Sequence, residues 1–383
     1  MSHIISRRRM IQTAGAATLA AQNSVAATMP PPRYEGIDTP KICLEAGAGG
    51  YGRGGAPVDA EEAAARRIKQ LGVDHVMAGA GRIPWEEAHL KAIIDRYKSW
   101  GLTVGNIMIA GFNNAIYARP DRDADIQKVI QSIQAAGKVG LPVVEYNWYA
   151  HRTMEGYFAE EGRAGAGWTG FDYSRQVDVN GKQVAVKDLP PLPDEGAHNL
   201  DEMWTNITYF LKAVIPEAEK AGVRLALHPN DPPAPVSRGS QQIMGTVDGW
   251  KKLIEIVKSP SNGITFDCGV TREMGQDPVE VCGYFASRDR INHVHFRNVK
   301  VKKPYERYDE VFIDEGENNM FAVMKELVKH KYKRLIYPEH PRGIDYDRER
   351  PNFRSQYPGG GGYAAYAFNV GYTRAMMQAA LSG

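Results

Sequence analysis

The chain has 383 residues, with 47 basic and 45 acidic side chains and a net charge of +2. This balance creates no field that favours nucleic acid or an anionic membrane surface, so we expect a small-molecule partner. Cys43, Cys268 and Cys282 are too few and too widely spaced for a disulfide framework or a four-thiolate zinc site. The length exceeds that of a usual domain but fits one large α/β barrel.

The N-terminus has the features of a transport signal. Residues 6–11 (SRRRMI) carry consecutive arginines before a weakly hydrophobic run, and residues 24–27 (SVAA) offer small side chains for cleavage. We therefore predict that residues 1–30 form a twin-arginine signal peptide and that the mature protein is periplasmic. The alternative is a disordered basic tail on a cytoplasmic protein. The run over residues 10–27 is too polar for stable insertion in a membrane.

From about residue 38 to the C-terminus, short apolar runs alternate eight times with amphipathic segments. The predicted strands are residues 41–45, 74–79, 103–109, 142–148, 223–228, 263–267, 291–296 and 334–339. The predicted helices are residues 59–71, 84–100, 121–139, 200–221, 247–258, 278–287, 318–330 and 363–381. Four of these helices are followed by glycines typical of helix C-termini, Gly72, Gly101, Gly140 and Gly222. The pattern predicts one (β/α)₈ TIM barrel over residues 38–383, and the lack of an early GxGxxG disfavours a doubly wound sheet.

Two connections are too long to be simple loops. Residues 150–199 form a predicted lid-like insertion after strand four, with a hairpin around Asn180-Gly181, and residues 341–362 follow strand eight. Both follow the C-terminal ends of strands, so we expect them over the barrel mouth. They are predicted to be lids or subunit contacts. Their length is compatible with a homo-oligomer, but the sequence does not identify an interface.

Four successive predicted strands end in good metal ligands: His228, Asp267, His295 and Glu339. Adjacent barrel strands lie about 4.8 Å apart, so these side chains can converge on one ion. Two imidazoles and two carboxylates suit Mn²⁺, Fe²⁺, Zn²⁺ or Co²⁺ better than Ca²⁺. A single strand-end His is more often a packing residue, and a single carboxylate can cap a helix, but four together predict a metal centre.

Period-two alternation extends this site. Arg297 shares a strand face with His295, so it is a candidate for binding a substrate carboxylate; the alternative is an ion pair with an acid of a neighbouring strand. Asn147 ends strand four, where its amide is a candidate for binding a polyol, and packing is again the alternative.

Several segments resemble, in order, the mannonate dehydratase family of xylose-isomerase-like barrels. They are residues 228–233 (HPNDPP), 262–266, 295–297 (HFR), 338–340 (PEH) and 358–363, together with Tyr146-Asn147-Trp148 and Phe171-Asp172. The resemblance implies a Mn²⁺- or Fe²⁺-dependent enzyme that dehydrates D-mannonate to 2-keto-3-deoxy-D-gluconate. By position, the four strand-end ligands match the family's metal ligands, and His340 and Tyr363 match its acid/base residues.

The chain departs from the family at two ligand positions. The family has Cys where this chain has Asp267 and Asp where it has Glu339, which makes the donor set harder and brings it nearer to that of sugar isomerases and epimerases. The signal peptide is a third difference, because the family's enzymes are cytoplasmic as a rule. The alternatives are therefore a sugar epimerase or isomerase, a 3-keto-sugar lyase or hydratase, and a non-catalytic periplasmic sugar-binding protein. Tyr363 also has a plainer interpretation, as a packing residue at a helix start.

Overall fold

A computed structural model describes residues 35–49, 58–351 and 353–383. The predicted signal peptide and most of the glycine-rich segment after the first strand lie outside the described residues. Eight parallel strands form a closed barrel: β1 (Lys41–Glu45), β2 (His75–Ala78), β3 (Thr103–Ile109), β4 (Val143–Tyr146), β9 (Arg224–Leu227), β12 (Asn262–Asp267), β13 (Ile291–His295) and β16 (Leu335–Tyr337). Each strand pairs with its sequence neighbour in the barrel, and β16 closes on β1. The predicted TIM-barrel fold is confirmed.

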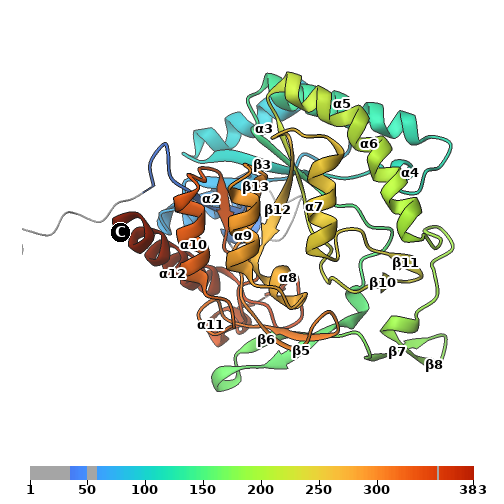
Figure 1. The fold of residues 1–383 in the computed structure, drawn as a ribbon. Coiled ribbons are helices and arrows are strands. Elements are labelled where there is room, and N and C mark those ends of the chain that lie inside the picture. Colours follow the sequence, from blue (N-terminus) through green and yellow to red (C-terminus); the bar gives the residue numbers. More distant parts are fainter. Residues whose placement is uncertain (1–34, 50–57, 352) are drawn as a thin grey trace, which may run out of the picture.

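One major helix follows each barrel strand and covers the outside of the sheet (Figure 1). These helices are α2 (Val58–Gln70), α3 (Glu87–Ser99), α5 (Arg122–Lys138), α6 (Leu200–Ala221), α7 (Val247–Ile256), α9 (Pro278–Ala286), α10 (Met320–Lys329) and α12 (Tyr363–Ser382). Three short helices, α4 (Asn113–Ile116), α8 (Cys268–Glu273) and α11 (Asp345–Arg348), lie in the connections.

The helix boundaries follow from local chemistry. Asn199 and Glu202 form a capping box at the start of α6, and Gly222 ends this helix with φ 68°. The other three predicted helix-terminating glycines also have positive φ. The prediction started α3 too early: Pro84 precedes the helix, and Glu86 is its extended N-cap.

A second layer covers the C-terminal end of the barrel. The insertion at residues 150–199 contributes β5 (Tyr157–Glu161), β6 (Gly167–Asp172) and the predicted Asn-Gly hairpin, β7 (Gln176–Val179) with β8 (Lys182–Ala185). A further hairpin after β13, β14 (Val299–Lys303) with β15 (Arg307–Glu310), joins the insertion in an antiparallel sheet of order β14-β15-β6-β5. Figure 1 shows β5 and β6 with α8 and α11 at one end of the barrel, at the bottom of the view.

The sequence analysis missed the β14–β15 hairpin. The local sequence of its strands is charged and resembles that of a surface loop. The hairpin is stabilised because β15 pairs with β6, which comes from a distant part of the chain. Tyr157, Phe171 and Tyr308 form the centre of a small apolar core beneath this four-stranded sheet, which we call the cap sheet. None of the helices in the described part of the chain is long and apolar enough to cross a bilayer.

Candidate active site

The four predicted metal ligands converge at the C-terminal end of the barrel. Asp267 and His295 end β12 and β13, whereas His228 and Glu339 lie just after β9 and β16. These four strands are neighbours in the sheet, and Asp267 pairs directly with His295 in the strand register. His228 Nε2 lies 3.0 Å from His295 Nδ1. The same His295 atom lies 3.0 Å from Glu339 Oε1 and 3.8 Å from Asp267 Oδ2. The donor atoms form two groups of three that share His295: one is Asp267, His295 and Glu339, and the other is Glu145, His228 and His295.

A fifth potential ligand, Glu145 on β4, was missed by the sequence analysis. Its Oε1 lies 3.5 Å from His295 Nε2, on the opposite side of the imidazole from the other carboxylates. Thr265 donates to Glu145 Oε1 at 2.6 Å and Asn106 donates to Oε2 at 2.9 Å, so the carboxylate is held firmly in the barrel interior. The available signal was a single acidic residue inside the apolar run VVEY.

Arg297 lies at the centre of a network of buried carboxylates. Its side chain is 2% exposed. Its guanidinium nitrogens contact five carboxylates: Asp267 (3.1 Å), Glu339 (3.1 Å), Glu273 (2.6 Å), Asp231 (3.5 Å) and Glu310 (3.7 Å). Arg297 is therefore an ion-pair partner of these acids, which is the alternative that the sequence left open. Its binding of substrate stays a prediction.

The charge of this network fits a divalent cation. Six buried carboxyl groups surround the barrel mouth against three guanidinium groups, listed as Glu145, Asp231, Asp267, Glu273, Glu310 and Glu339 against Arg152, Arg297 and Arg342. Glu339 Oε1 is buried without a hydrogen bond of good geometry, although His295 and Arg297 are near it. Buried charges of one sign are costly unless they are neutralised. A bound divalent ion would remove most of this excess.

The pKa shifts have the same origin. Burial, assisted by the neighbouring His295, lowers the pKa of His228 to about 4, which keeps this imidazole neutral and able to bind a metal. Burial opposes the charged form of His295, but Glu339 and Glu145 outweigh it and raise its pKa to about 9. Burial also raises the pKa of Asp267 to about 6 against the opposing effect of Arg297. The raised pKa of His295 thus reflects the carboxylates that surround it.

His340 lies beside the cluster, as its predicted acid/base role requires. Its Nδ1 is 2.8 Å from Glu310 Oε2, and its Nε2 is 3.5 Å from Glu339 Oε2. Burial opposes ionisation of Glu310, but His340 and Arg342 outweigh it and lower its pKa, so this carboxylate accepts the bond. His340 Nδ1 therefore donates, and Nε2 is left to accept a proton. The residue has a positive φ of 47°, which is uncommon outside glycine.

The structure does not bring Tyr363 to this cluster. Its hydroxyl donates to the backbone carbonyl of Arg67 on α2, at 2.9 Å, so the side chain packs between helices. Tyr357, in the long loop that precedes α12, lies in the site instead. Its ring centroid is 4.4 Å from that of His340, and its hydroxyl accepts a hydrogen bond from Arg152 Nη2 at 2.9 Å. The family pattern identified the loop, but only the fold distinguishes the two tyrosines.

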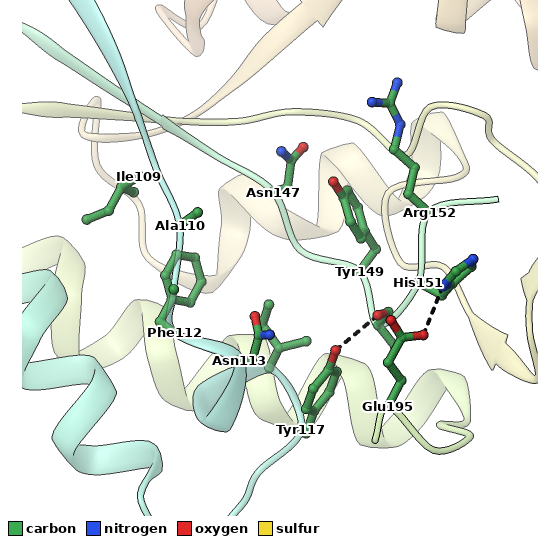
Figure 2. Close-up of a pocket in the computed structure, with 13 residues that line it drawn as sticks. Ile109, Ala110, Phe112, Asn113, Tyr117, Asn147, Tyr149, His151, Arg152 and Glu195 are labelled. Carbon is green, nitrogen blue, oxygen red and sulfur yellow. Dashed lines mark hydrogen bonds and ion pairs between the residues drawn. The ribbon is translucent and has the colours of Figure 1, made fainter. Parts of the chain in front are cut away.

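Asn147 lies at a pocket beside the ends of β3 and β4. Figure 2 shows that Asn147, Tyr149 and Arg152 project toward the same side of the segment that follows β4. On the other side of this pocket, Glu195 pairs with His151, with 2.8 Å between Oε2 and Nδ1. Asn147 is half-buried, and its amide makes only a weak contact with the sulfur of Met108. Its amide lines the pocket, and its contact with a polyol stays a prediction.

The fold and site together define a class: a (β/α)₈ barrel with a candidate divalent-metal centre at its C-terminal mouth. Comparison with known proteins is more specific. The family model for D-mannonate dehydratase (UxuA) matches residues 51–380. The chain therefore belongs to the D-mannonate dehydratase family, a family of sugar-acid hydro-lyases.

Individual relatives and solved structures are also similar to the chain. A mannonate dehydratase of Streptococcus agalactiae is 26% identical over 78% of this chain and 88% of its own length. One from Thermotoga maritima is 28% identical over 75% and 88%. The crystal structure of mannonate dehydratase from Streptococcus suis has a TM-score of 0.73 at 24% identity, covering 89% of this chain and 95% of that one. An L-ribulose 3-epimerase shares the fold, with a TM-score of 0.54 at 15% identity over 90% and 96%.

The His151 contacts predict a pH-dependent stability of the insertion. Burial lowers the pKa of His151, but its hydrogen bonds and charge interactions with Glu155 and Glu195 outweigh this and raise it. The stabilisation from protonated His151 is therefore fully present below the pKa of His151 in the unfolded chain, about 6.5. It is lost as the pH rises through the higher pKa of His151 in the folded protein. Hydrogen bonds with His151 and Arg238 also lower the pKa of Glu155 to about 2 despite burial. The stabilisation from this carboxylate is therefore fully present only above its pKa in the unfolded chain, about 4.5, which sets the lower end of the pH range.

We therefore expect His151→Gln to lower the thermal midpoint by roughly 2 °C between about pH 4.5 and 6.5. The difference from the unsubstituted protein should shrink progressively toward pH 9. Thermal unfolding of both proteins, followed by circular dichroism across this range, measures it. A difference that is constant with pH would contradict an imidazolium contact.

Proposed function

We propose that this chain is a divalent-metal-dependent dehydratase that converts D-mannonate to 2-keto-3-deoxy-D-gluconate. The observation that carries the proposal is the convergence of His228, Asp267, His295 and Glu339, with His340 beside them, in a member of this family. In the reaction, the C2–H and C3–OH bonds break, water leaves, and the resulting C2 enol tautomerises to the ketone. The protein must therefore supply one base for the C2 proton and one acid for the departing hydroxyl.

The four strand-end residues would hold the ion, and Glu145 would orient His295 from the other side of the ring. Mn²⁺ or Fe²⁺ is the ion that this mixed donor set and the family favour, with Zn²⁺ or Co²⁺ as further possibilities. Such an ion supplies a Lewis acid that stabilises negative charge next to the substrate carboxylate.

His340 is the proposed base. Glu310 accepts its Nδ1 proton, which fixes the tautomer and leaves Nε2 free to take a proton. The 2.8 Å contact also stabilises the imidazolium that forms, because the partner is an anion. This arrangement is a histidine oriented by a carboxylate, which is a common way to position a general base.

Tyr357 is the proposed acid, in place of Tyr363. Burial raises its pKa, although Arg152 opposes the shift, so the phenol stays protonated and is a donor rather than a base. Arg152 Nη2 donates to the Tyr357 oxygen, which leaves the phenol proton available for the departing 3-hydroxyl. Asn147, at the pocket near the end of β4, is proposed to contact hydroxyl groups of the substrate.

One observation favours a second candidate, a sugar epimerase or isomerase. The donor set contains two carboxylates, Asp267 and Glu339, and such enzymes also begin by removing a proton next to a carbonyl. Asp267 and Glu339 replace the Cys and Asp that the family resemblance implies, so the substrate must be tested directly.

The first test is an assay for a 2-keto-3-deoxy product from D-mannonate. We expect product from mature protein loaded with Mn²⁺ or Fe²⁺ and none from the same protein after chelator treatment, with activity restored by adding the metal back. Ketohexoses and aldopentoses serve as parallel substrates. Epimer or isomer formation without any dehydration of D-mannonate would replace the proposal with the second candidate.

His340→Gln is expected to lower kcat by roughly two to four orders of magnitude, since Gln cannot take up the C2 proton. Metal content should stay unchanged, because His340 is not among the four proposed ligands. His330→Gln, at the C-terminal end of α10, is the matched control and should retain activity. Loss of bound metal in His340→Gln would show that the residue is structural or a ligand.

We also propose that the chain is exported by the twin-arginine route. The supporting features are the arginines at positions 7–9 and the weakly hydrophobic run that follows them. Full-length protein should accumulate in the periplasm of a bacterial host and stay in the cytoplasm of a strain that lacks the twin-arginine translocase. Replacing the three arginines with lysine should have the same effect as removing the translocase. Equal distribution in both strains would contradict export.

A further inference from the structure

An anionic substrate needs a cation with free donors, and the site offers few. Three arginine side chains lie in the carboxylate network at the barrel mouth. Those of Arg297 and Arg342 are 2% and 1% exposed, and both are surrounded by carboxylate, carbonyl or hydroxyl oxygens. The side chain of Arg152 is 26% exposed and lines the pocket that also contains Asn147. Among the described residues of this network, Arg152 is therefore the arginine accessible to a ligand.

Arg152 is held on one edge and open on the other. Its Nε donates to the backbone carbonyl of Asp231 at 2.6 Å, and its Nη2 donates to Asp231 Oδ2 at 2.8 Å and to Tyr357 at 2.9 Å. Nη1 has no hydrogen-bond partner in the described part of the chain. A guanidinium has five N–H donors in a rigid plane, so fixing one edge aims the remaining donors.

The surroundings of Arg152 suit an acid with several hydroxyl groups. In Figure 2 the amide of Asn147 and the hydroxyl of Tyr149 project to the same side as the guanidinium. The carboxylate of the pocket, Glu195, is paired with His151 and lies on the opposite side. Among the residues that line this pocket, Asn147 and Tyr149 thus supply neutral hydrogen-bonding groups, and the carboxylate of Glu195 is already paired with His151.

We infer that Arg152 binds the substrate carboxylate and determines the preference of this site for sugar acids over neutral sugars. The inference deepens the proposed function and rests on it, because it takes an aldonic acid as the substrate. The hydrogen bond from Arg152 to Tyr357, and the packing of Tyr357 on His340, place the bound carboxylate beside the proposed acid and base. Arg152 thus takes the role that the sequence analysis predicted for Arg297. It also connects the insertion to the site, since it lies within residues 150–199.

The test compares a charged ligand with a neutral one of the same shape. Calorimetry measures binding of D-mannonate and of D-mannonamide to the Mn²⁺-loaded His340→Gln protein, in which turnover during the titration should be slow. Adding Arg152→Gln should weaken D-mannonate binding by roughly 10- to 100-fold and change D-mannonamide binding by about twofold or less. Arg152→Lys should recover part of the loss, because it retains the charge without the planar fork.

Arg163→Gln is the matched control. Arg163 lies in the same insertion but pairs with Asp314 at 2.9 Å and stacks on Phe312, outside the pocket, so its replacement should not alter discrimination. Equal weakening of acid and amide by Arg152→Gln would overturn the inference, because it would mark Arg152 as a support for Asp231 and Tyr357. No weakening of either ligand would overturn it as well.

The two proposals can fail separately. Absence of product with the unsubstituted protein would refute D-mannonate dehydration, yet Arg152-dependent binding of D-mannonate over the amide would still support carboxylate recognition. If the unsubstituted protein converts D-mannonate and Arg152→Gln leaves KM unchanged, the dehydratase proposal stands and the Arg152 inference falls.

Discussion

The burial of one guanidinium among five carboxylates is the interaction on which the rest of the site depends. Arg297 extends from the end of β13 and contacts acids from β12, α8, β15 and the loops after β9 and β16. Removing one partner of a buried ion pair typically costs about 3–5 kcal/mol, since it leaves an uncompensated charge. Arg297 therefore ties the barrel end to the cap sheet, and it still leaves more negative charge than the network can neutralise by itself.

This residual charge explains how the barrel and its additions work together. The barrel strands supply the metal ligands, whereas the cap sheet supplies Glu310, which orients His340, and the insertion supplies Arg152. Tyr157 of the cap sheet donates to Asp231 at 2.7 Å, so even its apolar core contributes a hydrogen bond to the network. The second layer is thus part of the active site rather than a cover over it.

The sequence predicted the parts of the site that depend on strand periodicity. Every predicted barrel strand is present, and Asp267 and His295 are paired in register because strand ends meet at one edge of a parallel barrel. Glu145 was missed because a single acid in a buried strand gives no periodic signal. Arg297 was predicted to face the barrel mouth. Three of the acids that contact it there, Asp231, Glu273 and Glu310, are brought together only by the tertiary structure.

Loop residues were the least predictable. Tyr357 lies in the connection before α12, and Tyr363, six positions later, is the first residue of that helix. Only the path of the connection places Tyr357 against His340. The β14–β15 hairpin was equally hidden, because its partner strand β6 is more than a hundred residues away. Interactions at this separation are set by the fold and leave little trace in local composition.

The central claim is that the excess of buried carboxylates is neutralised by one divalent ion at the strand ends. Its most direct test is a titration of chelator-stripped protein with Mn²⁺, following the signal of the free ion by electron paramagnetic resonance. The account predicts one bound ion per chain and a loss of affinity of at least about tenfold in Asp267→Asn and in Glu339→Gln. No binding, or binding that both variants leave unchanged, would contradict it.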